Sequence, residues 1–75
     1  MDLNEFVKAF AAEFEETSVE AFTPKTIYKD LKEWDSLGVL SIISMVDENF
    51  EKIITGADLR ALNTIEDLYN FVQSK

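Results

Sequence analysis

Residues 35–50 read Asp-Ser-Leu-Gly-Val-Leu-Ser-Ile-Ile-Ser-Met-Val-Asp-Glu-Asn-Phe, and this segment decides the fold. Asp35 is a good N-cap, because its carboxylate can accept hydrogen bonds from the free amides of a helical first turn. At about 100° per residue, one arc of roughly 100° collects most of the apolar side chains, with Met45 beside it. The arc contains Val39, Ile42, Ile43, Val46 and Phe50. The pattern therefore predicts a helix from Asp35 to Phe50 with one buried face.

The opposite face of this helix carries polar residues together with two leucines near the helix start. Its members are Leu37, Leu40, Ser41, Ser44, Asp47 and Glu48. Two neighbouring exposed leucines favour a docking surface for another protein, although single exposed leucines are ordinary surface residues. Gly38 costs about 1 kcal/mol relative to Ala inside a helix. Either the helix start is soft, or a partner approaches so closely that the side chain must be absent.

A first helix is predicted from Asp2 to about Glu16, since apolar residues recur there in steps of three and four: Leu3, Phe6, Val7, Phe10 and Phe14. From Thr17 to Trp34 the periodicity is lost, and Pro24 prevents a helix from continuing. This long segment is expected to be ordered, because apolar and aromatic side chains along it can anchor it to the core. They are Val19, Phe22, Ile27, Tyr28, Leu31 and Trp34.

A short helix is predicted from Ala57 to Leu62, after a connection over residues 51–56 in which Gly56 acts as a break. A last helix follows Thr64, with Asp67 three residues later as a variant of the capping box. Its apolar residues have helical spacing: Ile65, Leu68, Tyr69 and Val72. The expected fold class is all-α, a small bundle of three main helices and one short helix. Residues 1–75 are expected to form a single domain.

Composition excludes several classes of protein. The chain has 75 residues, of which 47% are hydrophobic, enough for a small core and too many for a disordered chain. No apolar run approaches the roughly 18 residues that span a bilayer, and the N-terminus does not resemble a signal peptide. We therefore expect a cytoplasmic protein without membrane insertion.

The chain contains no cysteine and no histidine. It therefore has no disulfide, no thiolate metal site, no thiol chemistry of its own and no imidazole base or ligand. Two glycines leave little material for an oxyanion loop. Catalysis and metal binding by this chain are disfavoured.

The net charge is −8, from 15 acidic and 7 basic residues. Nucleic acids and anionic membranes are disfavoured as partners, because both attract Lys and Arg. Basic patches on other proteins are the natural complement. The alternative is that acidity only keeps the protein soluble.

Residues 28–37, Tyr-Lys-Asp-Leu-Lys-Glu-Trp-Asp-Ser-Leu, resemble the attachment site of acyl carrier proteins, where Asp-Leu lies a few residues before Asp-Ser-Leu. Trp34 is similar to the residue before Asp-Ser-Leu in one subgroup of carriers, which has Trp-Asp-Ser-Leu. The resemblance continues along the chain. Glu48-Asn49-Phe50 is similar to the Glu-Glu-x-Phe that often closes the family's second helix. Ile53-Ile54, Leu62 and Thr64-Ile65 also match the family pattern.

The resemblance implies that Ser36 accepts covalent 4′-phosphopantetheine from coenzyme A through a phosphopantetheinyl transferase, which also reads Asp35. A first-turn serine lies at the surface, and the amides and dipole at a helix N-terminus favour a phosphodiester. The arm would supply the thiol that the chain lacks and hold acyl groups as thioesters. The plain alternative is an ordinary first-turn serine behind an aspartate cap.

The family resemblance also implies a partner surface for acyl-loading and acyl-processing enzymes such as ketoacyl synthases, formed by Leu37, Leu40, Asp47 and Glu48. An acyl chain can fold back between the second and third helices of family members. The matching residues are Val46, Ile54, Leu59 and Leu62. These four residues could instead simply fill the core and leave the acyl group in solvent. A monomer is the family default.

The sequence departs from the carriers of fatty-acid synthesis beside the serine. Those carriers usually have an acid directly after Asp-Ser-Leu and another a few residues on, where this chain has Gly38 and Ser41. A partner would therefore find few acids near Ser36. This departure and Trp34 favour a specialised or polyketide-type carrier over general fatty-acid synthesis. An aminoacyl or peptidyl carrier and an unmodified acidic helical adaptor are the alternatives.

Overall fold

The computed structural model describes residues 2–75, and over this range the chain is helical and has no strand. Its elements are α1 (Leu3–Ala11), η1 (Val19–Ala21), η2 (Tyr28–Asp30), α2 (Ser36–Phe50), α3 (Gly56–Ala61) and α4 (Ile65–Ser74), of which η1 and η2 are single 3₁₀ turns. The predicted all-α class is confirmed, with three longer helices, one short helix and a long ordered connection between the first two.

Helix α2 has the predicted bounds. The Asp35 carboxylate accepts a hydrogen bond from the Gly38 amide at 2.9 Å, and the helix ends where Glu51 turns left-handed at φ 56°. Ile42 and Val46 are fully buried, as predicted. The centre of the buried face is shifted toward Gly38 and Met45, however, and the other predicted members are only half-buried: Val39, Ile43 and Phe50.

Helix α1 ends at Ala11, so its predicted extension to about Glu16 is wrong. The chain leaves the helix through a tight turn, in which the Phe14 amide donates to the Ala11 carbonyl at 3.0 Å. Three glutamates follow Ala12, and negative charge is unfavourable at a helix C-terminus because the dipole is negative there. The turn nevertheless returns the Phe14 ring to the core, where it is 4% exposed.

The long connection is ordered, as predicted, but two of its expected anchors do not reach the core. Phe22 and Tyr28 are buried, whereas Val19 is 65% and Ile27 is 46% exposed. The 3₁₀ turn η1 has no buried residue, so this part of the connection, including Val19, lies at the surface. Ile27 contributes through its backbone instead, in an isolated antiparallel bridge to Thr64.

Aromatic rings attach the connection to α1. Trp34 lies 4.8 Å from the Tyr28 ring and stacks on Phe10 at 6.3 Å, measured between ring centroids. Phe14 and Phe22 extend the cluster at 5.9 Å. Aromatic pairs at such distances stabilise by about 0.5–1.5 kcal/mol beyond the area that they bury. The residues just before Ser36 are therefore held by packing.

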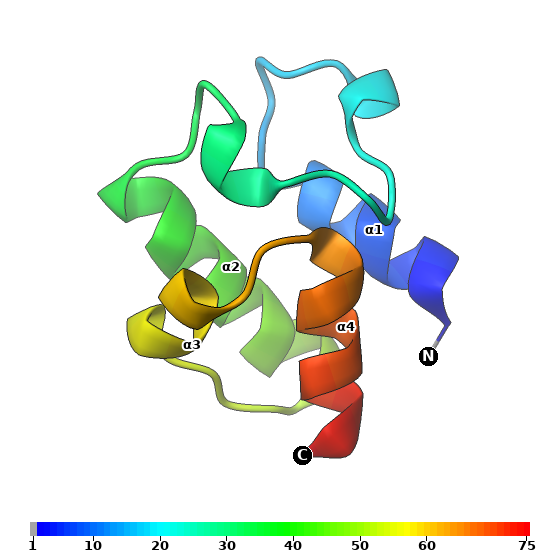
Figure 1. The fold of residues 1–75 in the computed structure, drawn as a ribbon, viewed down its shortest axis with the longest axis vertical. Coiled ribbons are helices and arrows are strands. Elements are labelled where there is room, and N and C mark those ends of the chain that lie inside the picture. The colour runs from blue at the N-terminus through cyan, green and yellow to red at the C-terminus, as the bar shows by residue number, and fades with distance from the viewer. Residues whose placement is uncertain (1) are drawn as a thin grey trace.

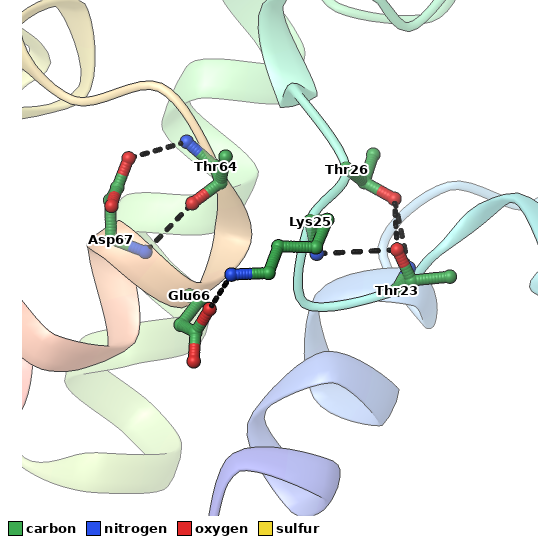
Figure 2. A network of polar contacts seen from close by, with 6 residues as sticks. All are labelled: Thr23, Lys25, Thr26, Thr64, Glu66 and Asp67. Carbon is green, nitrogen blue, oxygen red and sulfur yellow. Dashed lines mark hydrogen bonds and ion pairs between the residues drawn. The ribbon is translucent and has the colours of Figure 1, made fainter.

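The same connection covers the start of α4. The Ile65 amide donates to the Thr26 carbonyl at 3.1 Å and the Glu66 amide donates to the Pro24 carbonyl at 2.9 Å. Figure 2 shows the accompanying side chains: Lys25 forms an ion pair with Glu66 at 2.9 Å, and Thr64 and Asp67 form the predicted capping box. The first-turn amides of α4 are thus used within the chain.

Helix α3 starts at Gly56, so the prediction of Gly56 as a break is wrong. Thr55 caps the helix: its hydroxyl accepts from the Asp58 amide at 3.2 Å, and the Asp58 carboxylate accepts from the Thr55 amide at 2.9 Å. This second capping box has the same Thr-x-x-Asp spacing as the one at Thr64. The cap outweighs the poor helix propensity of glycine at the first position.

The helices pack with α1 against α4 and α2, and with α3 against α2. Figure 1 shows the long connection arching over the upper end of the bundle, where α2 begins, whereas the labelled chain ends lie in the lower half of the view. This arrangement gathers the exit of α1, the connection and the start of α2 at one end of the molecule.

Candidate functional site

Ser36 is the first residue of α2 and is exposed at the upper end of the bundle. Asp35 directly before it is also exposed and occupies the Gly38 amide with its carboxylate. The Val39 amide donates to the Asp35 carbonyl at 3.0 Å. Over residues 2–75, the amides of Ser36 and Leu37 have no acceptor within the chain.

Two unused amides beside an exposed hydroxyl suit a phosphodiester. Amides at a helix N-terminus donate readily to phosphate, and the helix dipole favours the negative charge. The contrast with α4 is informative, because its Ile65 and Glu66 amides already donate to loop carbonyls. The residues at the start of α2 therefore fit a phosphate ester on the Ser36 hydroxyl oxygen.

Gly38 is buried. Neither a soft helix start nor a close approach by a partner is needed to explain why this position has no side chain. An added Cβ would lie 3.2 Å from Cε1 of Phe14 and 3.3 Å from the carbonyl oxygen of Glu33. The missing side chain therefore makes room for the exit of α1 and for the backbone before Ser36. The close approach that requires glycine lies within the chain.

The outer face of α2 has the predicted composition. Leu37 is 73% and Leu40 is 59% exposed, and Asp47 and Glu48 are exposed further along the helix. The two leucines lie three residues apart on the same helix face, and neighbouring exposed apolar side chains are typical of a contact surface for another protein. They leave apolar area available beside Ser36.

The residues matched to an acyl-chain pocket lie in the core between α2, α3 and the segment joining them. Val46 is 0%, Ile54 is 2% and Leu59 is 1% exposed, whereas Leu62 is half-buried. All four are packed against neighbours, so an acyl chain could enter only by displacing side chains.

An open depression of about 420 Å³ lies beside the start of α2, where it is lined by Asp35 and Leu37, the two chain neighbours of Ser36, but not by Ser36 itself. Its walls come from the exit of α1, the segment before α2 and the first turns of α2, and they include four carboxylates: Glu13, Glu16, Glu33 and Asp35. The expectation of few acids near the serine was wrong. Glu33 and Asp35 belong to the segment directly before Ser36, but Glu13 and Glu16 lie about 20 positions upstream, where no local pattern around Ser36 could indicate them.

Residues 2–75, which the structure describes, contain neither a helix that could span a membrane nor a group of side chains that could hold a metal ion. No helix in this range is long and apolar enough to cross a membrane. The acidic side chains in it form no group of three or more that could hold a metal ion.

Comparison with known proteins agrees with this geometry. The family model described as "Phosphopantetheine attachment site" matches residues 5–72, which begin within α1 and end within α4, and so includes the Asp35-Ser36 pair. No curated protein and no solved structure shows a significant match. Because the matched region covers nearly all of the chain, the protein belongs to the phosphopantetheine-attachment family of acyl-carrier-type domains, whose cofactor is covalently bound 4′-phosphopantetheine.

Proposed function

We propose that the protein is an acyl carrier protein in which Ser36 bears the 4′-phosphopantetheine arm. The observation that carries the proposal is the exposed Ser36 hydroxyl at the first position of α2, beside two amides without acceptors in the described chain. The bound arm supplies a thiol, on which acyl intermediates are held as thioesters. The chain itself acts as a carrier and performs no catalysis.

Attachment requires a phosphopantetheinyl transferase. The Ser36 hydroxyl oxygen loses its proton to a base of the transferase and forms a bond to the pantetheine-bearing phosphorus of coenzyme A. The pyrophosphate bond breaks, and adenosine 3′,5′-bisphosphate leaves. Asp35 holds the first turn in place by capping Gly38 and presents its exposed carboxylate next to the reacting hydroxyl. The Ser36 and Leu37 amides are then available to the resulting phosphodiester.

Partner enzymes are proposed to dock on the outer face of α2, through Leu37 and Leu40 with Asp47 and Glu48 as charged contacts. The exposure of both leucines supports this role. Acyl-loading enzymes and acyl-processing enzymes such as ketoacyl synthases are the expected partners. We infer a cytoplasmic monomer of one domain. Because α2 carries no charge from Ser36 to Val46, unlike the second helix of fatty-acid synthesis carriers, we propose a dedicated or polyketide-type pathway.

The test of the function is intact mass before and after incubation with coenzyme A and a broad-specificity transferase. Wild type should gain one phosphopantetheine, and Ser36→Ala should gain none. Ser41→Ala is the matched control, because Ser41 lies on the same helix beyond its free amides, and it should be modified like wild type. Adduct on Ser36→Ala would refute the site. An unmodified wild type would favour the helical adaptor instead.

A second test concerns the acyl chain. We expect the chain to enter between α2 and α3 at Val46, Ile54, Leu59 and Leu62, where each buried methylene contributes about 0.8 kcal/mol. Because three of these side chains are at most 2% exposed, room should be limited to a short chain. Melting temperatures of the loaded protein should rise over the first few carbons and then level off. A flat series would show that the chain stays in solvent.

A further inference from the structure

The depression beside the start of α2 combines residues of the family motif with residues from the exit of α1, which the motif does not include. Glu13 and Glu16 come from the exit of α1, and Glu33 comes from the segment before α2. Phe14 and Gly38 lie between them and are buried, so they form the floor. We call this feature the α1-exit depression.

Its acids are held by the fold. The Thr17 hydroxyl donates to the Glu33 carboxylate and so ties the exit of α1 to the segment that precedes Ser36. The Phe14 ring lies 6.1 Å from the Trp34 ring, which fixes the same two segments from the inside. The backbone positions that carry Glu13, Glu16 and Glu33 are thus set before any partner arrives.

The charge of the depression is one-sided. Among residues 2–75, four carboxylates line it, and Lys32 is the only cationic side chain that does so. The adjoining surface of α2 has no charge between Ser36 and Val46. A concave surface lined by charge of one sign attracts a partner of opposite sign and speeds its association. The negative field near Ser36 therefore comes from the α1-exit depression rather than from α2.

An apolar contact adjoins this field. Leu37 borders the depression and is 73% exposed, and Leu40 follows one turn later. An occupant that complements both features has an apolar seat for leucine flanked by Lys or Arg side chains. A second copy of the chain does not fit, because its net charge of −8 would repel the acidic rim.

We infer that the enzyme which attaches the arm to Ser36 binds the α1-exit depression with a basic surface, and that Glu13 and Glu16 guide its approach. This inference rests on the proposed function and adds to it a footprint on α1 outside the face of α2. Asp35 and Leu37, the chain neighbours of Ser36, both line the depression, so an enzyme bound at the Ser36 hydroxyl lies next to its acidic wall.

The test compares two double variants with the same change in net charge. Glu13→Gln/Glu16→Gln removes two acids from the depression. Glu5→Gln/Glu20→Gln removes two exposed acids from the first turn of α1 and from η1, away from it. The readout is kcat/KM for transfer of phosphopantetheine from coenzyme A by a broad-specificity transferase, at ionic strengths of about 0.01 M and about 1 M.

At low ionic strength the depression variant should lose about tenfold in kcat/KM, whereas the control variant should lose less than twofold. At high ionic strength, where the screening length is about 3 Å, all three proteins should converge. Melting temperatures should stay at or above that of wild type, because the two neutralised acids lie at the C-terminal end of α1.

Two outcomes would overturn this inference without affecting the proposed carrier function. Equal losses in both double variants would mean that only total charge matters, and no loss in either would mean that charge does not guide the enzyme. In both cases the carrier function is still supported if the mass of wild type at the end of the reaction shows complete modification. A wild type that is not modified at all would overturn the carrier function and the inference together.

Discussion

Gly38 is the third residue of α2, a position where alanine would ordinarily raise helix stability by about 1 kcal/mol. Here an added Cβ would lie 3.2 Å from a Phe14 ring atom and 3.3 Å from the Glu33 carbonyl. The ring is buried and the carbonyl belongs to the backbone, so neither can yield cheaply. We therefore expect Gly38→Ala to lower the free energy of unfolding by about 1 kcal/mol, as measured by urea unfolding.

Gly56 provides the matched control for this substitution. It is the first residue of α3, and its added Cβ would meet a terminal nitrogen of Arg60 at 3.4 Å and a methyl of Val39 at 3.9 Å, both ordinary contacts. Gly56→Ala should therefore leave stability unchanged or raise it by up to about 1 kcal/mol. An equal gain at both glycines would contradict the close packing at Gly38.

Helix α2 separates a face that supports the core from a face that is free for partners. Ile42 is 0% exposed, and truncating a buried side chain of this size costs about 2–5 kcal/mol. Leu40 is 59% exposed, and substitutions at exposed positions usually change stability by less than about 0.5 kcal/mol. We expect Leu40→Ala to unfold in urea nearly like wild type and Ile42→Ala to unfold at much lower concentration. A large loss in Leu40→Ala would place that side chain in the core.

The pH dependence of the stability of the whole molecule involves Tyr28, which joins the long connection to α3. Its buried hydroxyl donates to the Leu59 carbonyl, and burial, with a smaller contribution from Asp67, raises the pKa of Tyr28 to about 12. In the unfolded chain this pKa is 10.0. The folded state therefore resists ionisation of Tyr28. The resulting stability is complete below pH 10 and is lost as the pH rises through about 12, by roughly 2–3 kcal/mol.

Urea unfolding between pH 9 and about 12 measures this loss, with Tyr28→Phe as the reference that cannot ionise. The hydrogen bond and charge of Glu66 raise the pKa of Lys25, and deprotonation of Lys25 adds to the alkaline decline in both proteins. Tyr28→Phe should be about 1 kcal/mol less stable at pH 9, because the Leu59 carbonyl loses its donor. As the pH rises, the free energy of unfolding of Tyr28→Phe should then fall less steeply than that of wild type. Parallel curves would show that Tyr28 does not control alkaline unfolding.

The residues that could be predicted are those whose behaviour depends on near neighbours in the chain. The Asp35 cap, the extent of α2 and the outward position of Leu40 follow from capping chemistry and helical period. The Thr64 capping box has the same local origin. The errors arose where local signals competed: the apolar spacing of α1 extends to Phe14, yet the helix ends at Ala11 because a turn also buries that ring.

The sequence by itself determined the helical class, the start of α2 and the serine within its family motif, because caps, periodicity and motifs act over a few residues. Only the tertiary structure decided what surrounds Ser36. It placed Glu13 and Glu16 beside the start of α2, although they lie some 20 residues upstream, and it filled the space at Gly38 with Phe14. Such contacts form when separate segments pack around a shared core, and no pattern of neighbouring residues encodes them.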